Sequence, residues 1–153
     1  MKESRYHSYE ESTGLLFWQV STLWQRAVKA SLRRFDLTFT QYAILAVIEE
    51  LSETSEEVTQ KQISDFSMID PMTVSSTLRL LEKKGLIGRN QSRTDSRANT
   101  ICNTQSAGKL LREAVAAVEN VDEAFFFEEE TDRRPWKELL CRLKEKNQGA
   151  AEK

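Results

Sequence analysis

Two helix-sized segments and a candidate hairpin follow one another in residues 58–104, which read VTQKQISDFSMIDPMTVSSTLRLLEKKGLIGRNQSRTDSRANTICNT. Thr59 and Gln62 have the spacing of a capping box, in which each side chain binds a free backbone N–H of the other residue. A helix is therefore expected to begin at about Thr59 and to run for two turns, with Ile63 and Phe66 facing inward.

A second helix is expected directly after the first. Asp70 is a favourable N-cap, and Pro71 suits the first helical position because its missing N–H would have no partner there. Gly85 is expected to end this helix. Two helices separated by such a short turn have the arrangement of a helix-turn-helix, in which the second helix is presented to the major groove of DNA.

A helical wheel divides the second helix into two faces. The apolar face is predicted to contain Val74, Leu78 and Leu81, with Thr77 beside them. The opposite face is short, polar and basic, and it contains Met72, Ser76, Arg79 and Lys83, flanked by Thr73 and Ser75. Arginine can pair with guanine, and serine or threonine can contact base edges or phosphates, so this face could read DNA. Taken alone, an ordinary solvated helix is the more economical interpretation.

The residues after the second helix favour the DNA-binding interpretation. Residues 86–90 and 98–102 are predicted to be strands, joined by a polar connection at 91–97. The segment 79–97 contains six basic and two acidic residues, although the whole chain has a net charge of −2. A cationic segment within an acidic chain is typical of a surface that binds phosphates.

The connection of the hairpin contains a candidate brace. Asp95 lies two residues from each of Arg93 and Arg97. Its carboxylate could therefore hold one guanidinium in place and leave the other free to bind DNA. A hairpin that only contacts water is the alternative.

These motifs, in this order, resemble those of the MarR (multiple antibiotic resistance regulator) family of transcription factors. The resemblance covers about residues 12–146 and rests on Thr73-Val74-Ser75, Leu78, Leu81-Glu82-Lys83-Lys84-Gly85-Leu86-Ile87, Asp95-Ser96-Arg97 and Thr104. The chain departs from the family pattern at Asn103, where leucine is usual, and at Gly108, which falls one residue late. The resemblance implies a winged helix-turn-helix lobe, a homodimer formed by helices from both chain ends, and a small, often aromatic or phenolic ligand bound between the dimer helices and the DNA-binding lobe.

Four aromatic residues are the candidates for contacting such a ligand. They are Trp18, Trp24, Phe39 and Tyr42. They occur on the helices that would line the implied cleft, yet packing within the core explains each of them more economically. A small aromatic effector is therefore an expectation from the resemblance alone.

The expected fold is mainly α with a small β-hairpin wing. Residues 1–36 are assigned to an N-terminal dimerisation helix, 37–103 to the winged helix-turn-helix DNA-binding lobe, and 104–153 to C-terminal dimerisation helices. The first helix has apolar residues around most of its circumference, and the three phenylalanines at 125–127 cannot all face one side of a helix. This excess of apolar surface predicts a homodimer, which suits a pseudo-palindromic operator. A monomer whose terminal helices pack on each other is the alternative.

Composition narrows the function classes. The chain is 39% hydrophobic and 30% charged, and no apolar run approaches the roughly 20 residues of a membrane-spanning helix, so a cytoplasmic protein is expected. Cys102 and Cys141 are expected to be reduced thiols, with a redox switch as the less favoured interpretation. The chain has no phosphate-binding loop, catalytic-serine motif or zinc motif, and its single histidine is His7. Neither an enzyme nor a metal or other cofactor is therefore expected.

The sequence predicts a dimeric, sequence-specific regulator that binds double-stranded DNA, with ligand-responsive repression as the favoured mode. Four residues are expected in the major groove, namely Thr73, Ser75, Ser76 and Arg79. Gln60, Lys61 and Lys83 are expected to bind phosphates. Arg93 or Arg97 is expected to reach an adjacent minor groove. The alternative is a winged-helix module that binds a protein, or DNA without sequence preference, and has no small-molecule effector.

Overall fold

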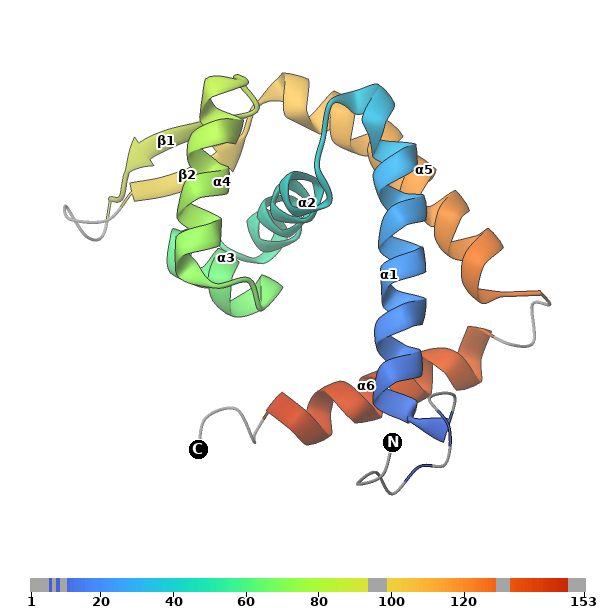
Figure 1. Cartoon of the computed structure of the whole chain (residues 1–153). Helices are drawn as coiled ribbons and strands as arrows, with labels where there is room; N and C mark the ends of the chain where they lie inside the picture. Colours follow the sequence, from blue (N-terminus) through green and yellow to red (C-terminus); the bar gives the residue numbers. More distant parts are fainter. Residues whose placement is uncertain (1–5, 7, 9–10, 94–98, 129–132, 149–153) are drawn as a thin grey trace. The chain divides into compact units, whose positions relative to one another are not determined.

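The computed structural model describes residues 6, 8, 11–93, 99–128 and 133–148. It is mainly helical and has a two-stranded antiparallel hairpin (Figure 1), which is the predicted fold class. In chain order the elements are α1 (Thr13–Leu32), the 3-10 helix η2 (Arg33–Phe35), α2 (Phe39–Thr54), α3 (Gln60–Ser67), α4 (Pro71–Lys83), β1 (Ile87–Gln91), β2 (Asn99–Asn103), α5 (Gln105–Phe126) and α6 (Arg133–Gln148). The chain divides into two compact units, Met1–Val118 and Glu119–Lys153.

Helix α2 is the centre of the first unit and contacts α1, α3, α4 and β2 (Figure 1). It begins with a capping box, because the Gln41 N–H donates to Thr38 Oγ1 and the Thr38 N–H donates to Gln41 Oε1, both at 3.2 Å. Ile44, Leu45 and Ile48 on its inner face are completely buried. The helices of the helix-turn-helix therefore pack on one apolar support whose start is fixed by local hydrogen bonds.

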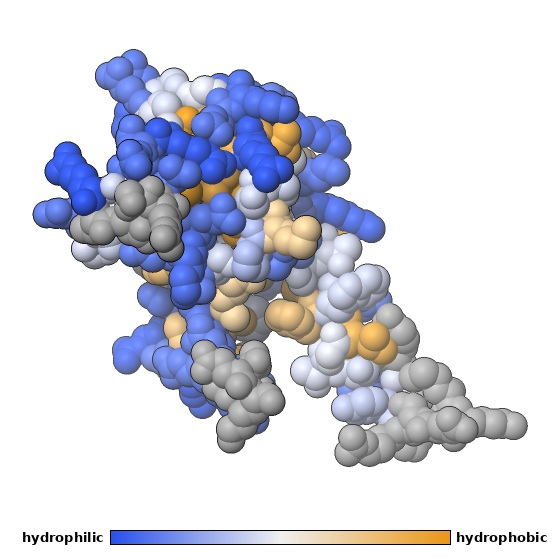
Figure 2. All heavy atoms as spheres, turned by 90° about the vertical axis from the view of Figure 1, so that its left-hand side faces the viewer, coloured by the Kyte–Doolittle hydropathy of each residue, from blue (hydrophilic) through white to orange (hydrophobic). Residues whose placement is uncertain are grey.

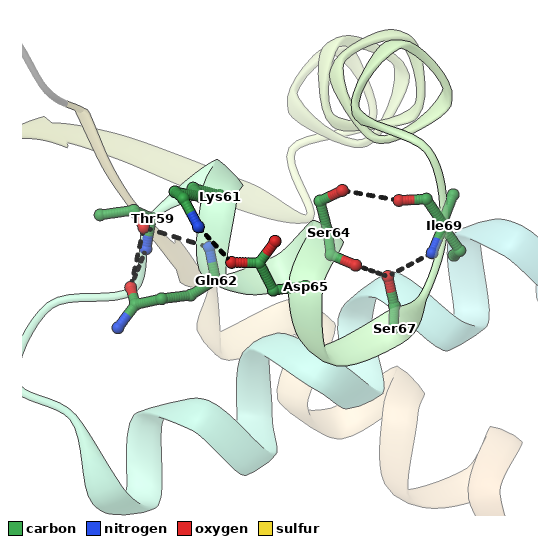
Figure 3. Close-up of polar contacts among 7 residues, drawn as sticks. All are labelled: Thr59, Lys61, Gln62, Ser64, Asp65, Ser67 and Ile69. Carbon is green, nitrogen blue, oxygen red and sulfur yellow. Dashed lines mark hydrogen bonds and ion pairs between the residues drawn. The ribbon is translucent and has the colours of Figure 1, made fainter. Parts of the chain in front are cut away.

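Helix α3 also begins with a capping box, formed by Thr59 and Gln62. The turn that follows it is closed by two serine side chains of α3 that bind the same residue (Figure 3). Ser64 Oγ donates to the carbonyl oxygen of Ile69 at 2.7 Å, and Ser67 Oγ accepts from its N–H at 3.2 Å. The predicted short turn between the two helices is thus held by hydrogen bonds to the N–H and the carbonyl oxygen of Ile69.

The prediction that Phe66 faces inward is wrong, since its side chain is 53% exposed. The inner face of α3 instead follows Gln60, Ile63, Ser64 and Ser67, which are buried or half-buried. At 100° per residue Phe66 lies about 110° from the centre of that face. A hydrogen bond accounts for the difference. Ser64 faces inward because its hydroxyl donates to the carbonyl oxygen of Ile69, and α3 is therefore rotated away from the orientation that its apolar residues alone indicate.

Helix α4 has the predicted start and the predicted end. Asp70 Oδ1 accepts from the Thr73 N–H at 2.9 Å, Pro71 is the first helical residue, and Gly85 adopts a left-handed φ of +68°. The Leu86 N–H then turns back to the carbonyl oxygen of Leu81 at 2.9 Å. This bond occupies Leu86, so strand pairing begins at Ile87. Both strands accordingly lie one residue later than predicted.

The hairpin is joined to the helices at both of its ends. The Ile101 N–H donates to the Val58 carbonyl oxygen at 2.8 Å, and Thr59 forms a bridge with Thr100, so the segment before α3 pairs with β2. Thr104 is the N-cap of α5, because its Oγ1 accepts from the Ala107 N–H at 3.2 Å. The same hydroxyl donates to the carbonyl oxygen of Gly85 at 2.9 Å. The hydroxyl of Thr104 thereby connects the end of α4 to the start of α5.

The second unit contains the end of α5 and helix α6. The ring of Phe126 lies 5.0 Å from that of Phe125 and 6.0 Å from that of Trp136, measured between centroids. The exposed large apolar residues of α6 are Leu139, Leu140 and Leu143. Thr131 and Asp132, which precede α6 and are of residue types that favour an N-cap, lie outside the described residues.

No helix in the described ranges has the length and apolar character that crossing a bilayer requires. Cys102 and Cys141 are both exposed free thiols.

We expect Asp70→Asn to lower stability near neutral pH and to have no such effect in acid. Hydrogen bonds from the Thr73 side chain, and then from its backbone N–H, lower the pKa of the Asp70 carboxyl below its ordinary value of 3.8. Its contribution is therefore complete above about pH 4 and is lost as the pH falls through the lower folded pKa. Asparagine keeps the cap without the charge.

The measurement is the denaturant midpoint of parent and variant at fixed protein concentration over a pH series from neutral to strongly acidic. The parent midpoint should be higher at neutral pH, and the two should converge below the folded pKa. A difference that is the same at every pH would contradict the role of the ionised cap.

Candidate nucleic-acid interface

The outer face of α4 carries the polar residues that the sequence assigned to DNA. Ser76, Arg79 and Lys83 are exposed, and Thr73 and Ser75 are half-buried. Ser76 Oγ donates to the Thr73 carbonyl oxygen at 3.0 Å, so its hydroxyl oxygen remains able to accept a further hydrogen bond. Arg79 and Lys83 have no ion pair with any residue that the structure describes. Their charges are therefore available to an external anion.

Two other basic residues of the same segment are already paired. Arg89 Nε lies 3.1 Å from Glu82 Oε2, which joins β1 to α4. Lys84 binds the segment between α1 and α2, where its Nζ donates to the carbonyl oxygen and, at 2.9 Å, to the carboxylate of Asp36. The local positive charge counted from the sequence therefore overstates the charge that is free to bind phosphate.

Lys84 has a third acceptor in Gln41 Oε1, at 3.4 Å. This oxygen also accepts from the Thr38 N–H in the capping box of α2. Lys84 thus connects the end of α4 both to the start of α2 and to Asp36, which adopts a left-handed φ of +52°. The side chain holds α4 in place and is not part of its outer polar face.

Helix α3 presents Gln60 and Lys61 at its start. Gln60 Nε2 donates to the carbonyl oxygen of Pro71 at 3.3 Å, which links the first residues of α3 and α4. Lys61 Nζ lies 2.5 Å from Asp65 Oδ2, and both side chains are mostly exposed (Figure 3). An exposed pair of this kind contributes little to stability, so phosphate can compete for the lysine.

The wing places Arg93 beyond the end of β1. The Arg93 side chain is exposed, and its backbone N–H donates to Glu57 Oε1 at 2.7 Å. The predicted brace Asp95 and the second predicted wing contact, Arg97, lie outside the described residues. The described part of the wing therefore offers one candidate DNA contact.

The surface around these residues is polar. The side of the molecule that carries the hairpin is turned toward the viewer in Figure 2, and hydrophilic side chains dominate its upper part. Two apolar residues of α4, Met72 and Leu80, are exceptions, with 83% and 50% of their surfaces exposed. A polar surface with basic residues on one helix and one hairpin has the chemistry that docking on phosphates requires.

The four aromatic ligand candidates do not all meet. The Phe39 ring lies 5.2 Å from that of Trp24 and 6.2 Å from that of Tyr42, and all three residues are half-buried. Trp18 is 62% exposed and is not among these ring contacts. The aromatic cluster thus joins α1 to α2, which is the packing role that the sequence also allowed.

A cavity of about 550 Å³ lies beside this cluster. Phe39 is the one of the four aromatic candidates that lines it. Most of the lining residues have polar or charged side chains, and the charged ones are Arg26, Lys29, Arg33, Asp36 and Lys84. The space next to Phe39 is therefore cationic, which the aromatic pattern of the sequence did not indicate.

Sequence patterns missed two long-range contacts of this lobe. The bonds from Glu57 to the wing and from Lys84 to Asp36 join residues that are 36 and 48 positions apart. Helical spacing and capping motifs describe neighbours within one or two turns, so they carry no signal for such pairs. Only the three-dimensional arrangement shows that Glu57 and Lys84 each join segments that are far apart in the sequence.

Comparisons with known proteins agree with this architecture. The MarR family model matches residues 37–98. The uncharacterized HTH-type transcriptional regulator YdcH of Bacillus subtilis (strain 168) is 37% identical over 123 residues, which cover 80% of this chain and 84% of YdcH.

Two solved structures are similar over nearly the whole chain. One is Bordetella bronchiseptica BpsR, whose DNA binding is regulated by 6-hydroxynicotinic acid, with a TM-score of 0.81, 18% identity and coverage of 92% of this chain and 97% of BpsR. The other is the Staphylococcus aureus MepR–DNA complex, with a TM-score of 0.77, 25% identity and coverage of 89% and 96%. The chain belongs to the MarR family of winged helix-turn-helix transcriptional regulators and is not an enzyme.

Proposed function

We propose that this regulator is a homodimer that binds a pseudo-palindromic operator in double-stranded DNA, represses transcription there, and is released by a small ligand. The observation that carries the proposal is the outer face of α4, where Arg79 and Lys83 are exposed and form no ion pair within the described residues. A helix that presents unpaired cations beside serine and threonine hydroxyls can form both base and phosphate contacts.

The residues divide into three roles in this proposal. Thr73, Ser75, Ser76 and Arg79 enter the major groove, since they lie in the first turns of the second helix of the motif. Gln60, Lys61 and Lys83 bind phosphates at its edges. Arg93 and Arg97 of the wing reach the adjacent minor groove. The MepR structure supports this assignment in general terms, because that relative was solved with DNA.

The homodimer accounts for apolar surface that the chain itself leaves open. The exposed large apolar residues of α1 are Leu16, Phe17, Trp18, Val20 and Leu23. Four of them, Leu16, Phe17, Val20 and Leu23, lie within about 120° of one another over two turns of the helix and form an apolar face that a second subunit would cover. We assign residues 1–36 and 104–153 to the dimer lobe and 37–103 to the DNA-binding lobe. Two-fold symmetry then places two recognition helices about 34 Å apart, one turn of DNA.

A small aromatic effector is the third part of the proposal. The regulation of BpsR by 6-hydroxynicotinic acid supports an effector of this chemical class. In this chain Trp24, Phe39 and Tyr42 provide aromatic surface next to the cationic cavity, and Trp18 adds an exposed ring on α1. Such a ligand acts only if it binds the DNA-competent and DNA-incompetent conformations with different affinities. We also propose a cytoplasmic location, because the proposed target is chromosomal DNA.

The first test is binding of the purified protein to the duplex upstream of its own gene and to a random duplex of equal length. We expect a dimer by sedimentation, a strong preference for the upstream duplex, and an affinity that falls steeply with salt because phosphate contacts release counterions. Equal weak binding to both duplexes would contradict operator recognition and indicate a non-specific or protein-binding module.

Arg79 and Lys83 form a matched pair of variants on one helix face. Arg79→Ala should cost about 1 to 3 kcal/mol of operator binding and relax the sequence preference, because it removes a base contact. Lys83→Ala should weaken operator and random DNA alike and make the salt dependence shallower by about one phosphate contact. Equal losses of Arg79→Ala on both duplexes would refute its assigned role.

Phe17→Glu combined with Leu23→Glu should convert the dimer to a monomer, since it places charges in the proposed dimer surface. Both side chains are more than half exposed within the chain, at 64% and 54%, so helix content should be retained. Operator affinity should fall by about a hundredfold or more, because the second half-site then binds independently. Gln19→Glu, an exposed change on the same helix, is the control. A double variant that still sediments as a dimer would locate the interface elsewhere.

A further inference from the structure

The base of the wing is held by the carboxylate of Glu57, a half-buried residue of the connection between α2 and α3. Ser92 Oγ donates to Glu57 Oε2 at 2.6 Å, and the Arg93 N–H donates to Glu57 Oε1 at 2.7 Å. Ser92 is itself 91% buried, since only 9% of its surface is exposed. Each oxygen of one carboxylate thus binds one of the two residues that follow β1.

The neighbours of Glu57 hold the other strand of the hairpin. The Val58 carbonyl oxygen accepts from the Ile101 N–H at 2.8 Å, and Thr59 bridges Thr100. Residues 57–59 therefore bind the exit of β1 through a side chain and β2 through the backbone. Because Thr59 is also the N-cap of α3, the direction of the wing is tied to the helix-turn-helix.

An acidic residue in this place opposes DNA binding by simple electrostatics. Its charge lies beside the wing residue that the proposed function assigns to the minor groove, and carboxylates repel phosphates. Two carboxylates near the candidate interface, Asp65 and Glu82, are paired with Lys61 and Arg89. Glu57 accepts from a hydroxyl and a backbone N–H of the wing, and such bonds fix a backbone conformation.

We propose that Glu57 is a positioning residue for DNA recognition, in addition to the contacts named above. Its carboxylate fixes the backbone of Ser92 and Arg93, so that the Arg93 side chain is held in the direction from which it reaches DNA. It thereby increases operator affinity although its own charge repels phosphate. The inference rests on the proposed DNA-binding function and adds a residue that does not touch DNA.

Two neighbouring substitutions test this inference, because they should change operator affinity differently. Glu56 is the adjacent exposed acid, so Glu56→Gln and Glu57→Gln remove the same charge one residue apart. Glu56→Gln should leave operator affinity unchanged or increase it, because it only reduces repulsion. Glu57→Gln should lower operator affinity on the order of tenfold, since it removes the negative charge that strengthens the hydrogen bonds from the Ser92 hydroxyl and the Arg93 N–H. Equal effects of the two variants would overturn the inference.

A double-mutant cycle separates positioning from a general loss of stability. In the Arg93→Ala background the effect of Glu57→Gln on operator affinity should shrink to less than about twofold, because the side chain that Glu57 positions is absent. A full effect in that background would overturn the inference, because Glu57 would then act without Arg93. Thermal unfolding of every variant identifies any that is not folded at the assay temperature.

Ser92→Ala is the second variant, and it keeps the charge of Glu57. It should lower operator affinity about threefold or more by releasing one of the two donors. No loss in Ser92→Ala, together with a full loss in Glu57→Gln, would leave the Arg93 N–H as the only positioned group and overturn the two-donor arrangement proposed here.

Failure of the inference is distinguishable from failure of the proposed function. If the parent protein does not prefer operator over random duplex, the proposed function fails. If the parent does prefer operator and Arg93→Ala weakens binding, but Glu57→Gln matches Glu56→Gln, only the positioning role of Glu57 fails.

Discussion

The backbone hydrogen bond from Ile101 to Val58 is the contact on which the arrangement of the DNA-binding lobe depends. It joins a strand of the hairpin to the residue that precedes the N-cap of α3. The turn between α3 and α4 is closed by Ser64 and Ser67, so each piece is connected to the next by short hydrogen bonds. The hairpin, α3 and α4 consequently form one unit whose parts keep their relative positions. Such preorganisation reduces the ordering that binding would otherwise require.

Local signals in the sequence were sufficient for most of the lobe. The capping box at Thr59, the Asp70–Pro71 start and the Gly85 end each describe contacts within a few residues, and the structure has all of them. The apolar pattern of α4 identified its outer face for the same reason. Orientation was harder to predict where a polar side chain competed with apolar ones, and Phe66 is exposed because Ser64 takes the inner face.

Contacts between distant residues were beyond the reach of sequence spacing. Counting charges between residues 79 and 97 found a basic segment, but the count could not show that Lys84 binds Asp36 or that Arg89 binds Glu82. These ion pairs reduce the positive charge that is free to bind an anion, because Lys84 and Arg89 are held by carboxylates within the lobe. In the proposed function, the field at the DNA is therefore set by a few side chains that form no ion pair within the described residues, Arg79 and Lys83 among them, and not by the net charge of the segment.

The hydroxyl of Thr104 has a consequence for how this lobe can vary. Its bond to the Gly85 carbonyl oxygen, and the bond of its N–H to Leu86 at 3.0 Å, close the hairpin at its base. Residues inserted or deleted between the two strands would then lengthen or shorten the far end without displacing α4 or α5. The wing can in this way change length during evolution, and with it the stretch of DNA that it spans, while the scaffold of the regulator stays the same.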